Sequence, residues 1–208
     1  MGVDLRAEVL LDRLQAQLAS YVASTAKGYL PVAGQASLWV EIAPGIEINR
    51  LTDVALKGTQ VRPAVQVVER AYGLLEVHSD SQAEVQEASR RILAHLGLRR
   101  EDRMVPKIQA SQIISHIDPH QAMLINRNRS GSMILGGQTL YILEVFPAAY
   151  AVLAANEAEK ASPVTLVEVR PFGAFGRLYM AGDDSSIQSA ARAAESALAN
   201  VAGRSAHE

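Results

Sequence analysis

The sequence from Pro44 to Val77, PGIEINRLTDVALKGTQVRPAVQVVERAYGLLEV, returns in altered form from Pro147 to Met180 as PAAYAVLAANEAEKASPVTLVEVRPFGAFGRLYM. The two segments align without a gap, and each position lies 103 residues before its partner. Seven of the paired positions are identical: Pro44/Pro147, Ala55/Ala158, Lys57/Lys160, Val61/Val164, Ala71/Ala174, Gly73/Gly176 and Leu75/Leu178. This offset is too long for a solenoid repeat and is typical of two tandem copies of one small domain.

The rest of the chain fits the same two copies. Its length of 208 residues is close to twice the offset, and the pairs Gly34-Gln35 and Gly137-Gln138 precede corresponding leucine–aromatic pairs. A polar run at residues 99–103 separates the copies. We therefore expect a first domain at residues 1–101 and a second domain at residues 102–208.

Each copy has a readable order of elements. In the first copy, residues 38–42 and 64–68 are rich in strand formers, and residues 74–77 form a further short apolar run after a turn near Gly73. Apolar residues at helical spacing predict a first helix from residue 48 to a cap at Gly58. A second helix is expected from Ser81 to Gly97, because Ser81 and Glu84 have the spacing of a capping box.

The order β-α-β-β-α is one strand short of the ferredoxin-like β-α-β-β-α-β unit. The unassigned apolar residues precede each copy, at residues 9–11 before the first and at residues 108–114 and 122–125 before the second. The missing edge strand is therefore expected from the amino-terminal side, which makes each copy a circular permutation. The predicted fold class is α+β, with two tandem circularly permuted ferredoxin-like domains.

Composition excludes several classes of protein. The chain has no cysteine, which rules out disulfides and thiolate metal sites, and its net charge of −2 offers no basic surface for nucleic acid. Hydrophobic residues make up 49% of the chain, but no apolar run reaches the ~20 residues of a membrane span. The amino terminus has no pattern of an export signal. We expect a soluble cytoplasmic protein with no nucleic-acid or membrane partner.

The candidate catalytic and metal-binding motifs are weak. His116, Asp118 and His120 would share one face of a regular strand, but Asp118-Pro119 favours a turn, so no metal site is predicted. The stretch at residues 78–80 contains His, Ser and Asp, and its position favours a strand end that leads into a helix cap. The acidic residues form no visible acid–base couple: Glu41, Glu47, Asp53 and Glu76. We therefore expect neither an enzyme nor a bound cofactor.

Two turns and two lysines occupy equivalent places in the copies. The turn between the paired strands contains Glu69-Arg70 in the first copy and Phe172-Gly173 in the second. Opposite charges at Glu69 and Arg70 could pair with symmetry mates around an axis, or form an ordinary exposed ion pair. Lys57 and Lys160 both fall in the last turn of the first helix of their copies, where lysine also stabilises the helix dipole.

The loop at residues 127–132 carries the alternative function. Its sequence, Arg127-Asn128-Arg129-Ser130-Gly131-Ser132, is basic and rich in small residues, but it lacks the spacing of a phosphate-binding loop. This segment leaves open a tandem ferredoxin-like regulatory protein that binds a small anionic effector.

Segments of both copies resemble bacterial microcompartment shell proteins of the permuted tandem-domain, trimeric type. The resemblance runs from about Leu5 to about Val201. It is carried by residues 38–42, 44–45, 53–57, 67–73, 124–127, 129–134, 154–160 and 173–178.

The resemblance implies a structural, non-enzymatic shell protein. Three chains would form a homotrimer that mimics a six-domain hexamer, tiles with other shell proteins in the shell, and in some relatives stacks as two trimers. Glu69 and Arg70 match the family's residues at a gated central pore for metabolites, with Phe172 and Gly173 as their uncharged counterparts. Lys57 and Lys160 match its edge lysine, which contacts neighbouring discs.

Overall fold

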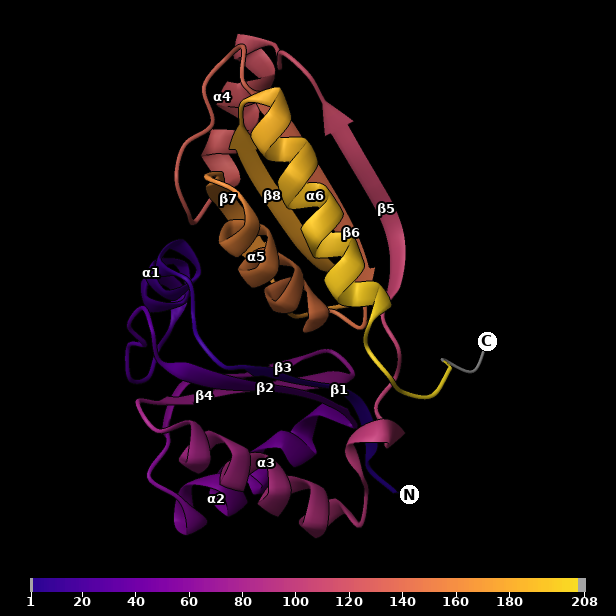
Figure 1. The fold of residues 1–208 in the computed structure, drawn as a ribbon. Helices are drawn as coiled ribbons and strands as arrows, with labels where there is room; N and C mark the ends of the chain where they lie inside the picture. The colour runs from indigo at the N-terminus through magenta and orange to yellow at the C-terminus, as the bar shows by residue number, and fades with distance from the viewer. Residues whose placement is uncertain (1, 206–208) are drawn as a thin grey trace.

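The computed structural model describes residues 2–205 as two antiparallel four-stranded sheets, each covered by helices (Figure 1). The first copy contains β1 (Asp4–Leu11), α1 (Ala16–Thr25), β2 (Ala36–Ala43), the 3₁₀ turn η1 (Gly45–Glu47), α2 (Ile48–Gly58), β3 (Arg62–Glu69), β4 (Tyr72–Ser79) and α3 (Gln82–Leu96). A second 3₁₀ turn, η2 (Arg100–Asp102), leads to β5 (Lys107–Ile114), α4 (Pro119–Asn128), β6 (Thr139–Phe146), α5 (Tyr150–Ala161), β7 (Thr165–Arg170), β8 (Gly176–Gly182) and α6 (Asp184–Ala199).

The strand order confirms the predicted permutation. The sheets run β1-β2-β4-β3 and β5-β6-β8-β7, and β1 and β5 are edge strands that precede the remainder of their copies. The apolar residues 108–114 lie in β5, whereas residues 122–125 lie in the helix α4. The α+β fold with an edge strand from the amino-terminal side is therefore as expected, and the helices α1 and α4 are additions that the sequence did not predict.

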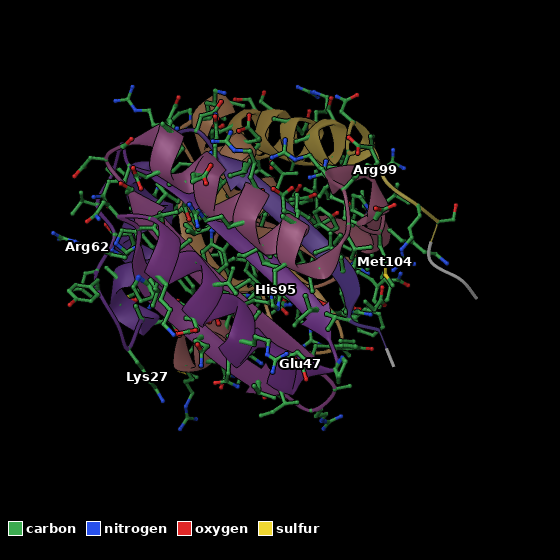
Figure 2. All side chains as sticks on the ribbon, turned by 90° about the horizontal axis from the view of Figure 1, so that it is seen from below. Lys27, Glu47, Arg62, His95, Arg99 and Met104 are labelled. Carbon is green, nitrogen blue, oxygen red and sulfur yellow. The ribbon has the colours of Figure 1, made fainter. Side chains whose placement is uncertain are left out.

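The first sheet separates two apolar layers because strand residues alternate between its faces. Leu38, Val40 and Ile42 of β2 pack in the core beneath α2 and α3. Trp39, between them, belongs to the core on the α1 side. Figure 2 looks onto α2 and α3, which together cover their face of this sheet.

The helix signals are largely confirmed. Ser81 is the N-cap of α3 and its side chain accepts a hydrogen bond from the Glu84 N–H at 3.4 Å. Gly97 ends the same helix in the left-handed conformation, with φ 67°. Gly58 is the last residue of α2, one position before its C-cap at Thr59. Ser81 therefore provides the expected cap, while the Glu84 carboxylate accepts instead from the Gln60 N–H.

Close backbone contact explains the glycine shared by the two copies. Gly73 and Gly176 lie at the start of β4 and β8, so the preceding turn ends just before them. A Cβ at Gly73 would overlap the carbonyl oxygen of Gly45, and one at Gly176 would overlap that of Ala148. Glycine at these positions lets the segment before α2 or α5 lie directly against the sheet.

The two copies share one continuous core. The helix α1 of the first copy packs against α5 and β7 of the second. Leu18 and Val22 of α1 are buried in the same cluster as Val152 of α5 and Val169 of β7. The apolar face of α1 is thus completed by residues of the other copy, and Figure 1 shows α1 beside α5.

The segment between the copies is fixed by a buried carboxylate. Glu8 of β1 is 1% exposed and accepts from the Ser89 hydroxyl at 2.7 Å. The guanidinium groups of Arg100 and Arg103 also contact its carboxylate, at 3.0 and 3.1 Å. These contacts attach η2 to the first sheet. Within residues 2–205, no helix is long and apolar enough to cross a membrane.

Candidate functional site

The first of the two equivalent turns is a tight hairpin. Glu69 ends β3 and pairs with Tyr72 at the start of β4, so Arg70 and Ala71 form the loop. Arg70 has a positive φ of 54°, as the commonest two-residue hairpin turns, types I′ and II′, require at their first central residue. The Gly45 N–H donates to the Ala71 carbonyl at 2.8 Å, which holds the turn against η1.

The second turn is longer and lies beside the first. Between Arg170 at the end of β7 and Gly176 at the start of β8, the chain passes through Phe172 and Gly173. Gly173 has φ 98°, and a Cβ placed on it would lie 4.0 Å from Cγ of Glu69. The structure thus brings together the four residues predicted at the turns.

Within residues 2–205, the charges of the first turn have no ion-pair partner. Glu69 is half-buried and Arg70 is exposed. Since neither side chain is paired within the described residues and both lie at a hairpin turn, they are available to groups of other molecules.

A buried arginine lies between the bases of both turns. The Arg6 guanidinium is 3.6 Å from the ring centre of Tyr72 and 4.7 Å from that of Phe146. Phe146 in turn contacts Phe175 of the second turn, with ring centres 6.2 Å apart. A cation held over aromatic faces is stabilised by their quadrupoles, so Arg6 connects the two turns through Tyr72 and Phe146.

Glu41 neutralises Arg6 and joins the two copies. Its carboxylate is 2.7 Å from Nε of Arg6, and its other oxygen accepts from the Ala149 N–H at 2.7 Å. Ala149 is the residue before α5, so the carboxylate lies at the positive end of that helix. Burial raises the pKa of Glu41, and Arg6 with the N–H groups of Ala148 and Ala149 opposes that rise.

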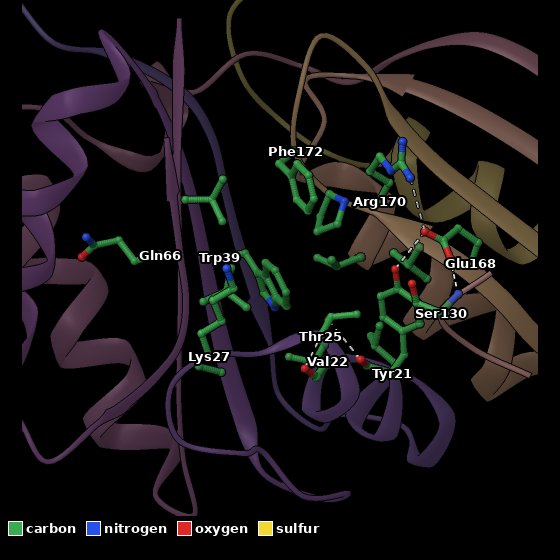
Figure 3. Close-up of a pocket in the computed structure, with 17 residues that line it drawn as sticks. Tyr21, Val22, Thr25, Lys27, Trp39, Gln66, Ser130, Glu168, Arg170 and Phe172 are labelled. Atoms are coloured by element: carbon green, nitrogen blue, oxygen red, sulfur yellow. Dashed lines mark hydrogen bonds and ion pairs between the residues drawn. The ribbon is translucent and has the colours of Figure 1, made fainter. Parts of the chain in front are cut away.

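A cavity of about 320 Å³ lies between the copies, next to the second turn. Its wall includes Tyr21 of α1, Trp39 of β2 and Phe172 (Figure 3). The Tyr21 hydroxyl donates to Glu168 at 3.2 Å. Burial, together with the Glu168 charge, raises the pKa of Tyr21, so the phenol stays protonated and keeps donating.

The two equivalent lysines lie on exposed helix surfaces, away from this cavity. Lys57 pairs with Asp53 at 2.8 Å and Lys160 pairs with Glu157 at 3.4 Å, both within their own helices. Their side chains are 76% and 63% exposed. Exposed ion pairs of this kind contribute little to stability, so they are easily exchanged for other partners. Both ammonium groups are therefore accessible to other molecules.

The residues of the two weak motifs, at 78–80 and 116–120, belong to the ordinary structure of their own segments. Asp118 caps α4 by accepting from the His120 N–H at 2.8 Å, with Pro119 in the first turn, so these two residues begin a helix and do not form the expected turn. His78 lies buried near the end of β4, 3.2 Å from Glu76. No group of His, Asp and Glu within residues 2–205 is arranged to hold a metal ion.

The basic loop is occupied by protein groups. The Ser130 N–H donates to the Glu168 carboxylate at 2.6 Å. The N–H groups of Gly131 and Ser132 donate to carbonyls of β7 at 2.9 Å. An anion at this loop would therefore have to displace a carboxylate and two strand hydrogen bonds, and the geometry gives no support to the effector site.

Arg6, Glu41 and Tyr21 were missed by the sequence analysis. Glu41 stood out only as one of several scattered acids, because its partner N–H is 108 residues away. An acidic residue in the middle of an otherwise apolar strand was the available signal, since a buried carboxylate requires a partner.

The comparisons with known proteins agree with this geometry. Residues 5–102 match the family model described as CsoS1D N-terminal domain, and residues 139–207 match that of the BMC domain. Carboxysome shell protein CcmP of Synechococcus elongatus is 57% identical over 98% of this chain and 96% of its own length. Carboxysome shell protein CsoS1D of Hydrogenovibrio crunogenus is 52% identical over 98% and 100%.

Solved structures give the same result. The fused permuted hexameric shell protein MSM0275 from the RMM microcompartment has a TM-score of 0.94 at 46% identity, covering 97% of this chain and 99% of that one. The double ringed trimeric shell protein MSM0271 has a TM-score of 0.95 at 40% identity, covering 98% and 100%. The chain therefore belongs to the bacterial microcompartment shell proteins with two tandem, permuted BMC domains.

Proposed function

We propose that three chains form a ring of six copies, which serves as one tile of a microcompartment shell. The supporting observation is the side-by-side position of the two turns, with Glu69 next to Gly173. If every pair of neighbouring copies in the ring has the same arrangement as the two copies of this chain, the six turns meet at the centre of the ring. Fused hexameric and trimeric shell proteins with the same fold support this arrangement.

Size-exclusion chromatography with light scattering tests the ring. We expect a mass of three times 22.4 kDa, or twice that if two trimers stack. A monomer that persists at high protein concentration would contradict the proposal. The double ringed relative supports stacking, and exposed apolar loop residues such as Leu30 and Leu135, each 60% exposed, offer a surface for it.

At the centre of this ring, Glu69 and Arg70 would act as a pore gate. Charge-assisted hydrogen bonds between these side chains in neighbouring chains are directional, so the pair can hold one closed arrangement and release it. Phe172 and Gly173 would contribute an uncharged lining between the charged turns.

The gate is tested by Glu69→Ala and Arg70→Ala, with Glu101→Ala on η2 as the control. We expect all three variants to remain trimeric, because the two turn side chains make no ion pair within the described chain. Conductance of the trimer inserted in a planar lipid bilayer should rise for the two turn variants alone. Loss of the trimer in Glu69→Ala would assign the residue a structural role.

Lys57 and Lys160 would act at the rim of the tile. Both are exposed on equivalent helix surfaces, where a flexible cation can contact a neighbouring disc. We expect Lys57→Glu with Lys160→Glu to abolish the extended layers seen by electron microscopy while leaving the trimer intact. Lys107→Glu on β5 is the matched control, and equal loss of layers in that variant would refute the assignment.

The remaining parts of the proposal follow from the shell role. The domains would be residues 1–101 and 102–208, and the two successive family matches, at residues 5–102 and 139–207, support a division into two units. The protein would act in the microcompartment shell beside other shell proteins, without catalysis. In support of this, the motifs at His78 and Asp118 have structural roles within their own segments.

A further inference from the structure

The cavity between the copies is large enough for a small organic molecule. Its volume is about 320 Å³, whereas a cavity of about 150 Å³ is enough to hold benzene. Both copies contribute apolar side chains to its wall, among them Leu18, Val22, Val65, Val152 and Phe172. A mostly apolar cavity of this size with a few polar groups is typical of small-molecule sites.

One polar atom in the wall has no partner. Trp39 is 1% exposed, and among residues 2–205 its indole Nε1 forms no hydrogen bond. In Figure 3 the Trp39 side chain points from β2 toward Tyr21 and Phe172, on the opposite side of the cavity. A buried N–H without an acceptor is destabilising, so a ligand that accepts from it would recover that loss.

The fold itself does not require an indole at this position. The strands β2 and β6 have the same place in their sheets. Trp39 pairs with Glu76 across the first sheet, as Ile142 pairs with Tyr179 across the second. An aliphatic side chain therefore satisfies the equivalent position of the second copy, and the buried donor is a feature of the cavity.

The carboxylate in the wall is already bonded within the chain. Glu168 accepts from the Tyr21 hydroxyl at 3.2 Å and from the Ser130 N–H at 2.6 Å. The Arg170 guanidinium lies 3.9 Å from the same carboxylate. Gln66 also borders the cavity, but its side chain points away from it (Figure 3). A bound molecule would therefore meet the free donor of the indole rather than a free carboxylate.

Two cations line the cavity and are exposed at the surface: Lys27 and Arg170. Within the described part of the chain, Lys27 forms no ion pair. Because both side chains reach solvent, we expect the entrance of the cavity on their side. Their two positive charges exceed the single negative charge of Glu168, so the cavity favours an anion.

We infer that this cavity binds a small monocarboxylate with an apolar body, whose oxygens accept from the Trp39 indole and whose charge faces Lys27. The apolar body packs against Val152 and Phe172. A water molecule suits this wall less well, because it needs about two to four polar partners and the lining is mostly apolar. All of these residues belong to one chain, so the site does not depend on the proposed ring.

Trp39 is the only tryptophan of the chain, so its fluorescence reports on the cavity directly. Cyclohexanecarboxylate is the probe, because it combines a carboxylate with an apolar ring and does not absorb where indole is excited. We expect a saturable change in Trp39 emission with a Kd of about 10 mM or lower. Cyclohexylammonium, which has the same ring without an acceptor, and inorganic phosphate, which has no apolar body, should give no saturable change.

A variant that fills the cavity should lose this binding. Val65 lines the cavity from β3 and is half-buried, so the ring of Val65→Phe can enter the cavity. Val68→Phe is the matched control, because Val68 lies on the opposite face of the same strand and is 44% exposed. We expect only Val65→Phe to lose the emission change, and circular dichroism should show the same fold for both variants.

Two further variants separate the indole from the ammonium group. Trp39→Phe removes the N–H but keeps an aromatic ring, and it should weaken binding about tenfold or more, measured by ligand-observed NMR beside the wild type. Lys27→Met should weaken binding about two- to fivefold, because its charge is exposed. Lys107→Met on β5 is the matched control outside the cavity, and it should leave the Kd unchanged.

Several results would overturn the assignment. A wild-type protein without a saturable change, or with an equal change for cyclohexylammonium or phosphate, would do so. Undiminished binding by a folded Val65→Phe would place the probe outside the cavity and would also overturn it. If Trp39→Phe did not fold, Val65→Phe and Lys27→Met would still decide, because both keep the tryptophan and its fluorescence.

Discussion

Removal of the Glu41 carboxylate should be among the most costly single changes in the first copy. Glu41 and Arg6 have side chains that are 2% and 5% exposed, and Glu41 also accepts from the Ala149 N–H. Glu41→Ala leaves both a cation and a backbone donor buried without a partner. Breaking one member of a buried pair costs about 3–5 kcal/mol.

The effect should be plain in thermal unfolding. For a chain of this size, each kcal/mol shifts the midpoint by about 2–4 °C, so Glu41→Ala should lower it by about 6–20 °C. Glu41→Gln should recover part of the loss, because its amide oxygen can still accept from Ala149. Arg6→Met combined with Glu41→Leu should recover more, since it removes both charges together.

Glu87→Ala is the matched control. Glu87 also contacts two arginines, Arg90 and Arg91, at 2.9 and 2.8 Å, but on the exposed surface of α3. Its removal should shift the midpoint far less. The reasoning would be refuted if the two alanine variants unfolded at the same temperature, because burial would then contribute nothing to the Glu41 contact.

Three further predictions follow from single contacts. Gly176→Ala should lower the unfolding midpoint sharply, because its Cβ would overlap the Ala148 carbonyl; normal unfolding of this variant would contradict the close approach. Tyr150→Phe should cost about 1–3 kcal/mol in urea unfolding, since the buried hydroxyl donates to the Met104 carbonyl at 2.5 Å. Hydrogen bonds from Ser186 and Ser185 lower the pKa of Asp183 from 3.8 to about 2. Its stabilising effect is complete above the unfolded value and is lost as pH falls toward 2, so Asp183→Asn should flatten that part of the stability–pH curve.

The fold was largely predictable because each copy carries local signals. Ser81 and Gly97 bound a helix by their own chemistry, and the unassigned apolar residues before each copy pointed to the edge strand. The helix α1 was missed because Gln15 provides no side-chain cap and because the apolar face of the helix packs against α5 and β7 of the second copy. The cap Asp118 and the following Pro119 were visible signals for α4, but they were read only as a turn.

The candidate site was predictable only in part. The offset of 103 residues identified Glu69 and Phe172 as equivalents, and the structure places their turns side by side. Arg6 and Glu41 could not be paired from the sequence, because the contact that explains them joins strands with a helix of the other copy. Such contacts depend on the packing of the two copies and leave no local pattern.

In the first turn of α1, the N–H groups of Gln17 and Leu18 donate to the Glu159 carboxylate of the second copy. This contact has a consequence for synthesis of the chain. The donor at Gln17 and its acceptor are 142 residues apart. At about 5–20 residues per second, the ribosome needs about 7–30 s to make the segment between them. During that interval, the first copy emerges with the start of α1 unsatisfied and one apolar layer open to water. A fragment that stops after residue 101 keeps that layer open permanently, so it should aggregate where the full chain folds.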